Sequence, residues 1–176
     1  MRQILLALTC AALGACATQP DNSVHVPMAM TAASGAGGSI GEVLISSERD
    51  GVALRLRLHG LPPGPHGFHL HSTSSCDAAT AANGAVTLGG GAGGHFDPSA
   101  TGQHMGPMGQ GHLGDLPTLV VGADGAANQT LHVTRLRSPD EFRGHAFVIH
   151  AGGDNYSDLP TPSGGGGARL ACGVIH

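Results

Sequence analysis

Gly67-Phe68-His69-Leu70-His71 alternates apolar and imidazole side chains. Side chains two positions apart on a β-strand point to the same face. The pattern therefore predicts a strand with Phe68 and Leu70 on one face and with His69 and His71 side by side on the other. Neutral imidazole is a ligand for Cu, Zn, Fe and Ni. An isolated His-x-His is more often a surface pair, so ligands elsewhere in the chain decide whether this pair is half of a metal site.

In several further segments, apolar and polar residues alternate, or apolar residues follow one another, between residues typical of turns. These segments indicate short strands. Residues 24–28 are expected to form an edge strand because Pro27 cannot donate to a β-ladder. The sequence Glu48-Arg49-Asp50-Gly51 predicts a hairpin turn in which Gly51 supplies a positive φ. Short antiparallel strands between Gly and Pro turns are typical of an all-β sandwich or barrel. The other predicted strands are 40–46, 52–59, 119–121, 129–133, 144–150 and 169–175.

The composition indicates one small, loop-rich β domain. The chain has 176 residues with 30 Gly and 11 Pro, and 40% are hydrophobic but only 3% aromatic. We therefore expect a core of mostly Val, Leu, Ile and Ala. The chain has no Lys, and it contains eight Arg and twelve acidic residues. Without basic clusters we expect no nucleic-acid partner. The twelve His are the compositional anomaly.

The N-terminus resembles a bacterial export signal. Arg2 precedes an apolar run over residues 4–12 that is too short to span a bilayer as a helix. Leu13-Gly14-Ala15-Cys16 resembles a lipobox, so we expect an acylated Cys16; the alternative is an ordinary signal peptide cleaved after Ala15. The lipid would be the sole membrane anchor, at ~0.8 kcal/mol per buried CH₂. By this likeness we expect a periplasmic protein anchored to the outer membrane, with a signal peptide at 1–15, a tether at 16–22 and a folded domain at 23–176.

The cysteines indicate a single disulfide. Cys10 leaves with the signal and Cys16 takes the lipid, so Cys76 and Cys172 remain as an even pair in an exported protein. Such pairs are oxidised outside the cytoplasm. Arg169 lies three residues before Cys172. The disulfide would therefore hold Arg169 beside the loop that follows the His-x-His strand.

Residues 72–117 form a long segment with little predicted regular structure. A loop of this length in a compact domain is normally functional or disordered. Singly, each of its candidate ligands would more often be a surface residue. Together they match a closed tetrahedral Zn²⁺ set with bonds of ~2.0–2.2 Å, and the binding energy of the metal would fold the loop. The candidates are His95, His104, His112 and Asp115.

A second constellation includes His150, which follows the apolar residues 147–149 and precedes a second Gly-rich loop over residues 151–167. With His69 and His71, it would supply three nitrogens. One more ligand would complete the tetragonal field that Cu(II) prefers.

In this order, the motifs resemble the exported copper/zinc superoxide dismutases of bacteria, over about residues 24–175. This resemblance implies an eight-stranded Greek-key β-barrel or sandwich, immunoglobulin-like, with two long functional loops. The motifs that carry it are His66-Gly67-Phe68-His69-Leu70-His71, Gly93-Gly94-His95-Phe96-Asp97-Pro98, Gly111-His112-Leu113-Gly114-Asp115-Leu116-Pro117, His150 with Gly152-Gly153-Asp154-Asn155, and residues 164–167 with Arg169-Leu170-Ala171-Cys172-Gly173-Val174-Ile175.

The resemblance also implies residue roles. Asp154 would link a copper ligand to a zinc ligand, Arg169 would dock the superoxide anion, and His66 would be a structural histidine. Cys76 and Cys172 match the family's disulfide. The implied ligands are His69, His71, His95 and His150 for copper and His95, His104, His112 and Asp115 for zinc, with His95 bridging both ions.

The implied activity is superoxide dismutation, in which copper is alternately reduced and oxidised and two superoxide anions and two protons become O₂ and H₂O₂. It would serve the antioxidant defence of the cell envelope, in a monomer or a homodimer. The alternative is a non-catalytic copper-binding or storage lipoprotein on the same fold; a third interpretation is a purely structural β module. The combination of His150 and Arg169 favours the enzyme, since storage needs no anion dock. His25, Met28 and Met30 would be a copper-acquisition patch or plain strand and loop residues, and we favour the latter.

Overall fold

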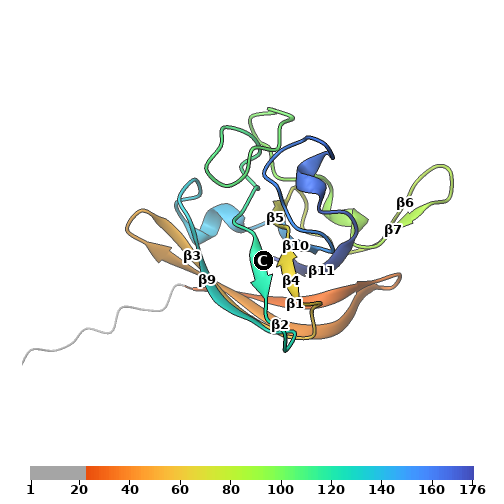
Figure 1. The fold of residues 1–176 in the computed structure, drawn as a ribbon, viewed down its shortest axis with the longest axis horizontal. Helices are drawn as coiled ribbons and strands as arrows, with labels where there is room; N and C mark the ends of the chain where they lie inside the picture. The colour runs from red at the N-terminus through yellow and green to blue at the C-terminus, as the bar shows by residue number, and fades with distance from the viewer. Residues whose placement is uncertain (1–22) are drawn as a thin grey trace, which may run out of the picture.

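The computed structural model describes residues 23–176, so the predicted signal peptide, the acylated Cys16 and the tether at 16–22 lie outside the described residues. The described chain is a curved antiparallel sheet with long loops rising from one side (Figure 1). No helix within it has the length and apolarity needed to cross a membrane. The strands are β1 (Val24–Ala32), β2 (Gly35–Glu48), β3 (Gly51–Leu58), β4 (Gly64–His66), β5 (Phe68–His71), β6 (Ala79–Thr80), β7 (Val86–Thr87), β8 (Leu119–Val121), β9 (Ala127–Val133), β10 (Ala146–His150) and β11 (Arg169–Val174), and the 3₁₀ helices are η1 (Gly90–Ala92), η2 (Pro139–Phe142) and η3 (Ser163–Gly165).

The main sheet has the order β5-β10-β11-β1-β2-β3-β9, and β4 pairs separately with β8. Only Gly67 separates β4 from β5, so these two strands continue one another along the chain. A turn after β8 leads into β9, with Gly122 N donating to Ala126 O at 2.8 Å. The sheet thus curls toward closure. Counting β4 and β5 together, the predicted eight-stranded Greek-key architecture is confirmed; β6 and β7 form an additional hairpin within the long loop, which the sequence did not predict.

The prediction of an edge strand holds for residues 24–28, which pair with β2 alone, but not for the whole of β1, which lies between β11 and β2. The ladder between β1 and β11 contains only the pairs Ala29↔Cys172 and Met30↔Ala171. Pro27 lies outside this short ladder and pairs with Glu42 on β2. Its missing N–H therefore interrupts no bond toward β11.

The proposed copper-acquisition patch on β1 is not formed. Met28 is fully buried and Met30 packs against the core. His25 is exposed, and its Nδ1 lies 3.1 Å from Glu42 Oε2. These three residues are strand residues, as favoured.

The core lies inside the curve of the sheet and consists mainly of Val, Leu and Ile, as the composition predicts. Phe68, Phe142 and Phe147 are also fully buried there. The rings of Phe68 and Phe147 have centroids 5.0 Å apart. Side chains alternate along a strand, so His69 and His71 on β5 point to the face opposite that of Phe68. They therefore lie on the outside of the sheet.

Strand β10 is buried on both faces. Phe147 and Ile149 belong to the main core, while Ala146 and Val148 belong to a small second cluster on the outer face. Cys172 and Ala92 complete that cluster, and Cys76 packs against it. The predicted disulfide between Cys76 and Cys172 is present, with Cα atoms 5.7 Å apart. It holds the start of the long loop over the outer face, where the two histidines of β5 lie.

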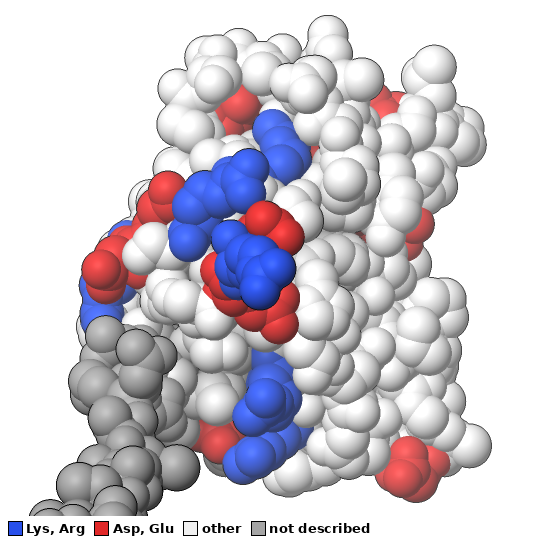
Figure 2. Space-filling view, turned by 90° about the vertical axis from the view of Figure 1, so that its left-hand side faces the viewer, with Lys and Arg blue, Asp and Glu red and all other residues white. Residues whose placement is uncertain are grey.

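Charged side chains do not form a broad cationic surface on the face seen in Figure 2. Blue and red side chains lie next to one another there, and most of the face is uncharged. The formal net charge of the chain is −4. This face therefore lacks the single-sign basic patch that nucleic-acid binding needs.

Candidate metal centre

The free edge of β5 positions the long loop. β5 pairs with β10 on one side only. On its other side, Leu70 N donates to Gly114 O at 2.9 Å, and Leu70 O accepts from Phe96 N at 2.8 Å. A Cβ on Gly114 would clash with Leu70 O, so only glycine allows this approach.

This pairing places ligand candidates from the loop opposite those of the strand. His71 faces His95 and His69 faces Asp115 across isolated β-bridges. Each pair combines residues more than twenty positions apart in the sequence, and the backbone fixes both. Metal ligands held in this way need little further ordering when an ion binds.

Four histidines form the first ligand group, with one nitrogen from each lying within 4.8 Å of the others: His69, His71, His95 and His150. His71 donates through Nδ1 to Gly93 O (2.9 Å), and His150 donates through Nδ1 to Gly167 O (3.2 Å). Since a carbonyl oxygen only accepts, both rings carry their proton on Nδ1. Their Nε2 atoms lie 3.4 Å apart and remain available as ligands.

Burial favours the ligating form of this group. Desolvation lowers the pKa of His69 to about 4 and that of His150 to about 3. Desolvation also lowers the pKa of His71 well below its usual value. These three imidazoles are therefore neutral at pH 7, which is the form that binds metals.

The second ligand group surrounds one carboxylate oxygen, Asp115 Oδ1. His104 Nδ1 lies 2.9 Å from it, His95 Nδ1 3.0 Å and His112 Nδ1 3.2 Å. Ligands ~2.0–2.1 Å from a tetrahedral ion lie about 3.3 Å from one another. The three distances to Asp115 Oδ1 are close to this value, and all four ligand atoms lie within 4.8 Å of one another, so the group could hold a zinc-sized ion. The other oxygen of Asp115 accepts from Met105 N at 3.0 Å, which fixes the carboxylate.

Asp154 joins the two groups. Its Oδ2 lies 2.8 Å from His69 Nε2 and its Oδ1 lies 2.7 Å from His104 Nε2. Both side chains and the carboxylate are fully buried. The other nitrogens of the two rings, His69 Nδ1 and His104 Nδ1, are buried without a hydrogen bond, although the latter is close to Asp115. Buried, unpaired ring nitrogens directed into a ligand group fit bound metal ions.

Two carboxylates oppose the effect of burial on the pKa of His104. Burial alone lowers its pKa, but the adjacent carboxylates of Asp115 and Asp154 outweigh burial and raise that pKa to about 9. In return, burial opposes ionisation of the two carboxyls, while their histidine partners hold both pKa values well below the usual range. A metal that binds His104 through Nδ1 must displace a proton.

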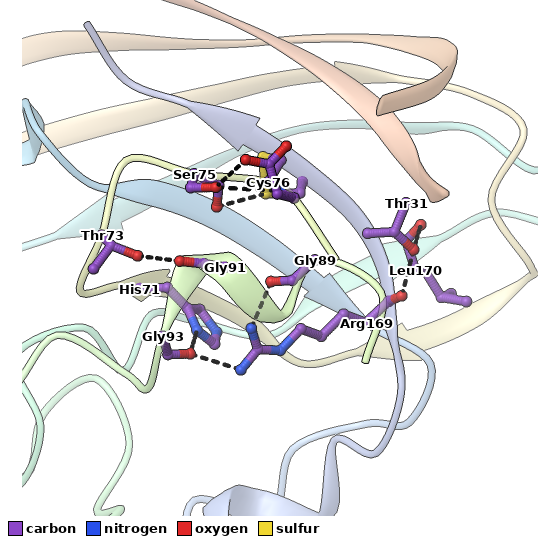
Figure 3. The surroundings of a disulfide bond; sticks show 12 residues. Thr31, His71, Thr73, Ser75, Cys76, Gly89, Gly91, Gly93, Arg169 and Leu170 are labelled. Carbon is purple, nitrogen blue, oxygen red and sulfur yellow. Dashed lines mark hydrogen bonds between the residues drawn. A yellow bond between two sulfur atoms is a disulfide. The ribbon is translucent and has the colours of Figure 1, made fainter. Parts of the chain in front are cut away.

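A pocket of about 730 Å³ opens onto both groups, and His71, His95, His150 and Arg169 are among its lining residues. The Arg169 guanidinium donates to Gly89 O and Gly93 O, each at 2.6 Å (Figure 3). Thr31 Oγ1 donates to the backbone oxygen of Arg169 at 2.7 Å. The predicted position of Arg169, beside the loop that the disulfide holds, is therefore observed.

Two residues that support the site were not predicted from the sequence. Asp158, in the second long loop, accepts from His104 N at 2.8 Å, and Arg135 donates to the backbone oxygens of Gly111 (2.9 Å) and His112 (2.8 Å). Both act on backbone groups, which leave no pattern in the sequence. His66, expected to be structural, is buried, and its ring nitrogens lie 2.7 Å from the backbone oxygens of His150 and Pro62.

Comparison with known proteins identifies close relatives. Residues 39–175 match the family model described as copper/zinc superoxide dismutase. The chain is 49% identical over 170 residues to superoxide dismutase [Cu-Zn] 2 of Salmonella typhimurium, covering 97% of this chain and 98% of that one. It is 50% identical over 153 residues to superoxide dismutase [Cu-Zn] of Escherichia coli, covering 87% and 88%.

Solved structures agree with these matches. The Cu/Zn superoxide dismutase of Brucella abortus superposes with a TM-score of 0.85 at 43% identity, covering 88% of this chain and 99% of that one. The monomeric enzyme of Salmonella enterica gives a TM-score of 0.79 at 51% identity, with the same coverage.

Proposed function

The chain belongs to the copper/zinc superoxide dismutase family, and from this membership we propose which of its residues carry the activity. The protein is an oxidoreductase that uses copper and zinc to convert two superoxide anions and two protons into O₂ and H₂O₂. Bound copper supplies the one-electron couple, and bound zinc supplies a fixed positive charge.

The copper ligands we propose are His69, His71, His95 and His150, and the zinc ligands are His95, His104, His112 and Asp115. The observation that carries this assignment is that His95 belongs to both groups. Asp154 supports it, because this carboxylate contacts one ring from each group and would fix the orientation of both.

Arg169 is the proposed dock for the superoxide anion. A guanidinium has five N–H groups, and two carbonyl bonds leave three for an anion in the pocket. Backbone oxygens cannot neutralise the guanidinium, so its charge acts on the pocket. A storage protein has no use for such a dock, which argues against the storage alternative.

His95 is the residue we propose to hold and release a proton near the substrate. Its Nδ1 lies 3.0 Å from Asp115 Oδ1, so Nε2 is the nitrogen left for the other ligand group. Its side chain is 6% exposed and lines the pocket, where it meets incoming molecules. A proton carried on Nε2 would reach the substrate without crossing bulk water.

The finer localisation is also a proposal. The lipobox-like residues 13–16 and the bacterial relatives support export to the periplasm, with Cys16 acylated and anchored in the outer membrane. The subunit state, monomer or homodimer, stays a prediction.

The test compares superoxide removal by the copper- and zinc-loaded protein and by two charge-reversed variants. Arg169→Glu should lose most of the activity while keeping its metal content. Arg55→Glu makes the same charge change at an exposed position on β3 and should remain close to the wild type. Equal rates in the two variants would refute the anion dock, and a wild type without activity would refute the proposed function.

A further inference from the structure

Charge in the pocket is carried by very few side chains. Among the described residues that line it, histidines aside, only Arg169 and Asp97 are ionisable. Arg169 suits an anionic substrate. Asp97 has the opposite sign and lies two residues after His95, so its presence in a pocket that admits superoxide needs an explanation.

The carboxylate of Asp97 is held in place. Its Oδ2 accepts from Gly102 N at 2.8 Å, and its two oxygens lie 3.1 and 3.2 Å from Thr101 Oγ1. Both partners are neutral. Within residues 23–176 no arginine or histidine forms an ion pair with Asp97, and His112 acts on it only at longer range, so its charge acts on the pocket.

We propose that Asp97 sets the ion preference of the pocket: it slows the entry of superoxide and speeds the entry of the metal cations that load the two ligand groups. The anion part rests on the proposed function, because it takes the pocket as the route of superoxide. The cation part requires only that metals reach the ligand groups through the same opening. His95, His112 and His150 line the same pocket as Asp97, so an entering cation meets proposed ligands there.

The expected effects are modest and opposite in sign. One unit charge about 10 Å from an ion in water changes its local concentration about twofold, and salt of ~0.5 M removes most of this effect. Loss of the Asp97 charge should therefore make anion entry about twofold faster and cation entry about twofold slower at low salt. Damage to the loop would instead weaken both.

The experiment uses Asp97→Asn and Asp97→Ser, which remove the charge with different side chains. Asp124→Asn is the matched control: Asp124 also accepts a backbone bond, from Ala126 N at 3.1 Å, but lies in the turn between β8 and β9 and does not line the pocket. Three quantities are measured at ~10 mM and ~0.5 M salt. They are the superoxide rate constant, the azide affinity of the copper-loaded protein from its visible spectrum, and the rate of Zn²⁺ uptake by the metal-free protein.

The proposal predicts faster superoxide removal, tighter azide binding and slower Zn²⁺ uptake in both Asp97 variants at low salt, with no such changes in Asp124→Asn. It is overturned if azide binding and Zn²⁺ uptake change in the same direction, if neither changes, or if the control variant behaves alike. A wild type that removes no superoxide would refute the proposed function alone, because the azide and Zn²⁺ measurements still decide the role of Asp97.

Discussion

His71 and Arg169 share one hydrogen-bond acceptor. The carbonyl oxygen of Gly93 lies 2.9 Å from His71 Nδ1 and 2.6 Å from Arg169 Nη2 (Figure 3). A proposed copper ligand and the proposed anion dock are thus held at a fixed distance by a single peptide group. That peptide lies two residues before His95, so one short segment sets the relative positions of dock, ligand and shared ring.

Removal of the carboxylate at the centre of the second ligand group should abolish zinc binding without abolishing copper binding. We expect Asp115→Ala to lose zinc and loosen the loop over residues 72–118, but to retain copper, because Asp115 does not belong to the first group. Metal analysis and thermal unfolding of the loaded variant measure both effects. Unchanged thermal stability would contradict a structural role for zinc.

The disulfide should stabilise the protein and position the dock. Cys76 and Cys172 are 96 residues apart, for which loss of the cross-link costs ~4–5 kcal/mol of unfolding free energy in the chain-entropy model. The double variant Cys76→Ser/Cys172→Ser should also lose activity beyond its loss of metal, since the segment that holds Arg169 is released. Denaturant unfolding of the metal-free proteins measures the first effect. Equal midpoints would rule it out.

Zinc uptake should release a proton at pH 7.5. The pKa of His104 is raised to about 9, so the metal-free protein carries a proton there that zinc must displace. The histidines of the first group have lowered pKa values and are already neutral, so copper uptake by His69, His71 and His150 should release far less. Titration calorimetry in two buffers of different ionisation enthalpy counts the protons. Zinc binding with a buffer-independent heat would show that His104 is neutral before binding.

The rate of superoxide removal should depend weakly on ionic strength. The chain has no Lys, and the single Arg of the pocket is opposed by Asp97. We expect a decrease of less than about threefold between ~10 mM and ~0.3 M salt, because long-range attraction of the anion is small. A steep decrease would reveal attraction from charges outside the pocket.

Side-chain patterns predicted most of the strands and the group of His95, His104, His112 and Asp115, because alternation and metal chemistry both leave marks in the sequence. The place of His95 in the first ligand group as well came only from the family resemblance. The position of β1 could not be predicted, since Pro27 shows only that one N–H is missing, not how long the neighbouring ladder is. Side-chain hydrogen bonds to backbone groups could not be predicted either. Asp158 accepts from His104 N and Arg135 donates to His112 O, and neither contact has a recognisable sequence motif. The β6–β7 hairpin was missed because its strands are two residues long.

The most direct test of the account is anomalous diffraction at the copper and zinc edges from a crystal grown with both ions. We predict one ion of each kind, with the ring of His95 between them and each of its nitrogens ~2.0–2.1 Å from one ion. An ion bound away from His95, or both ions on the same side of its ring, would contradict the shared-ligand centre.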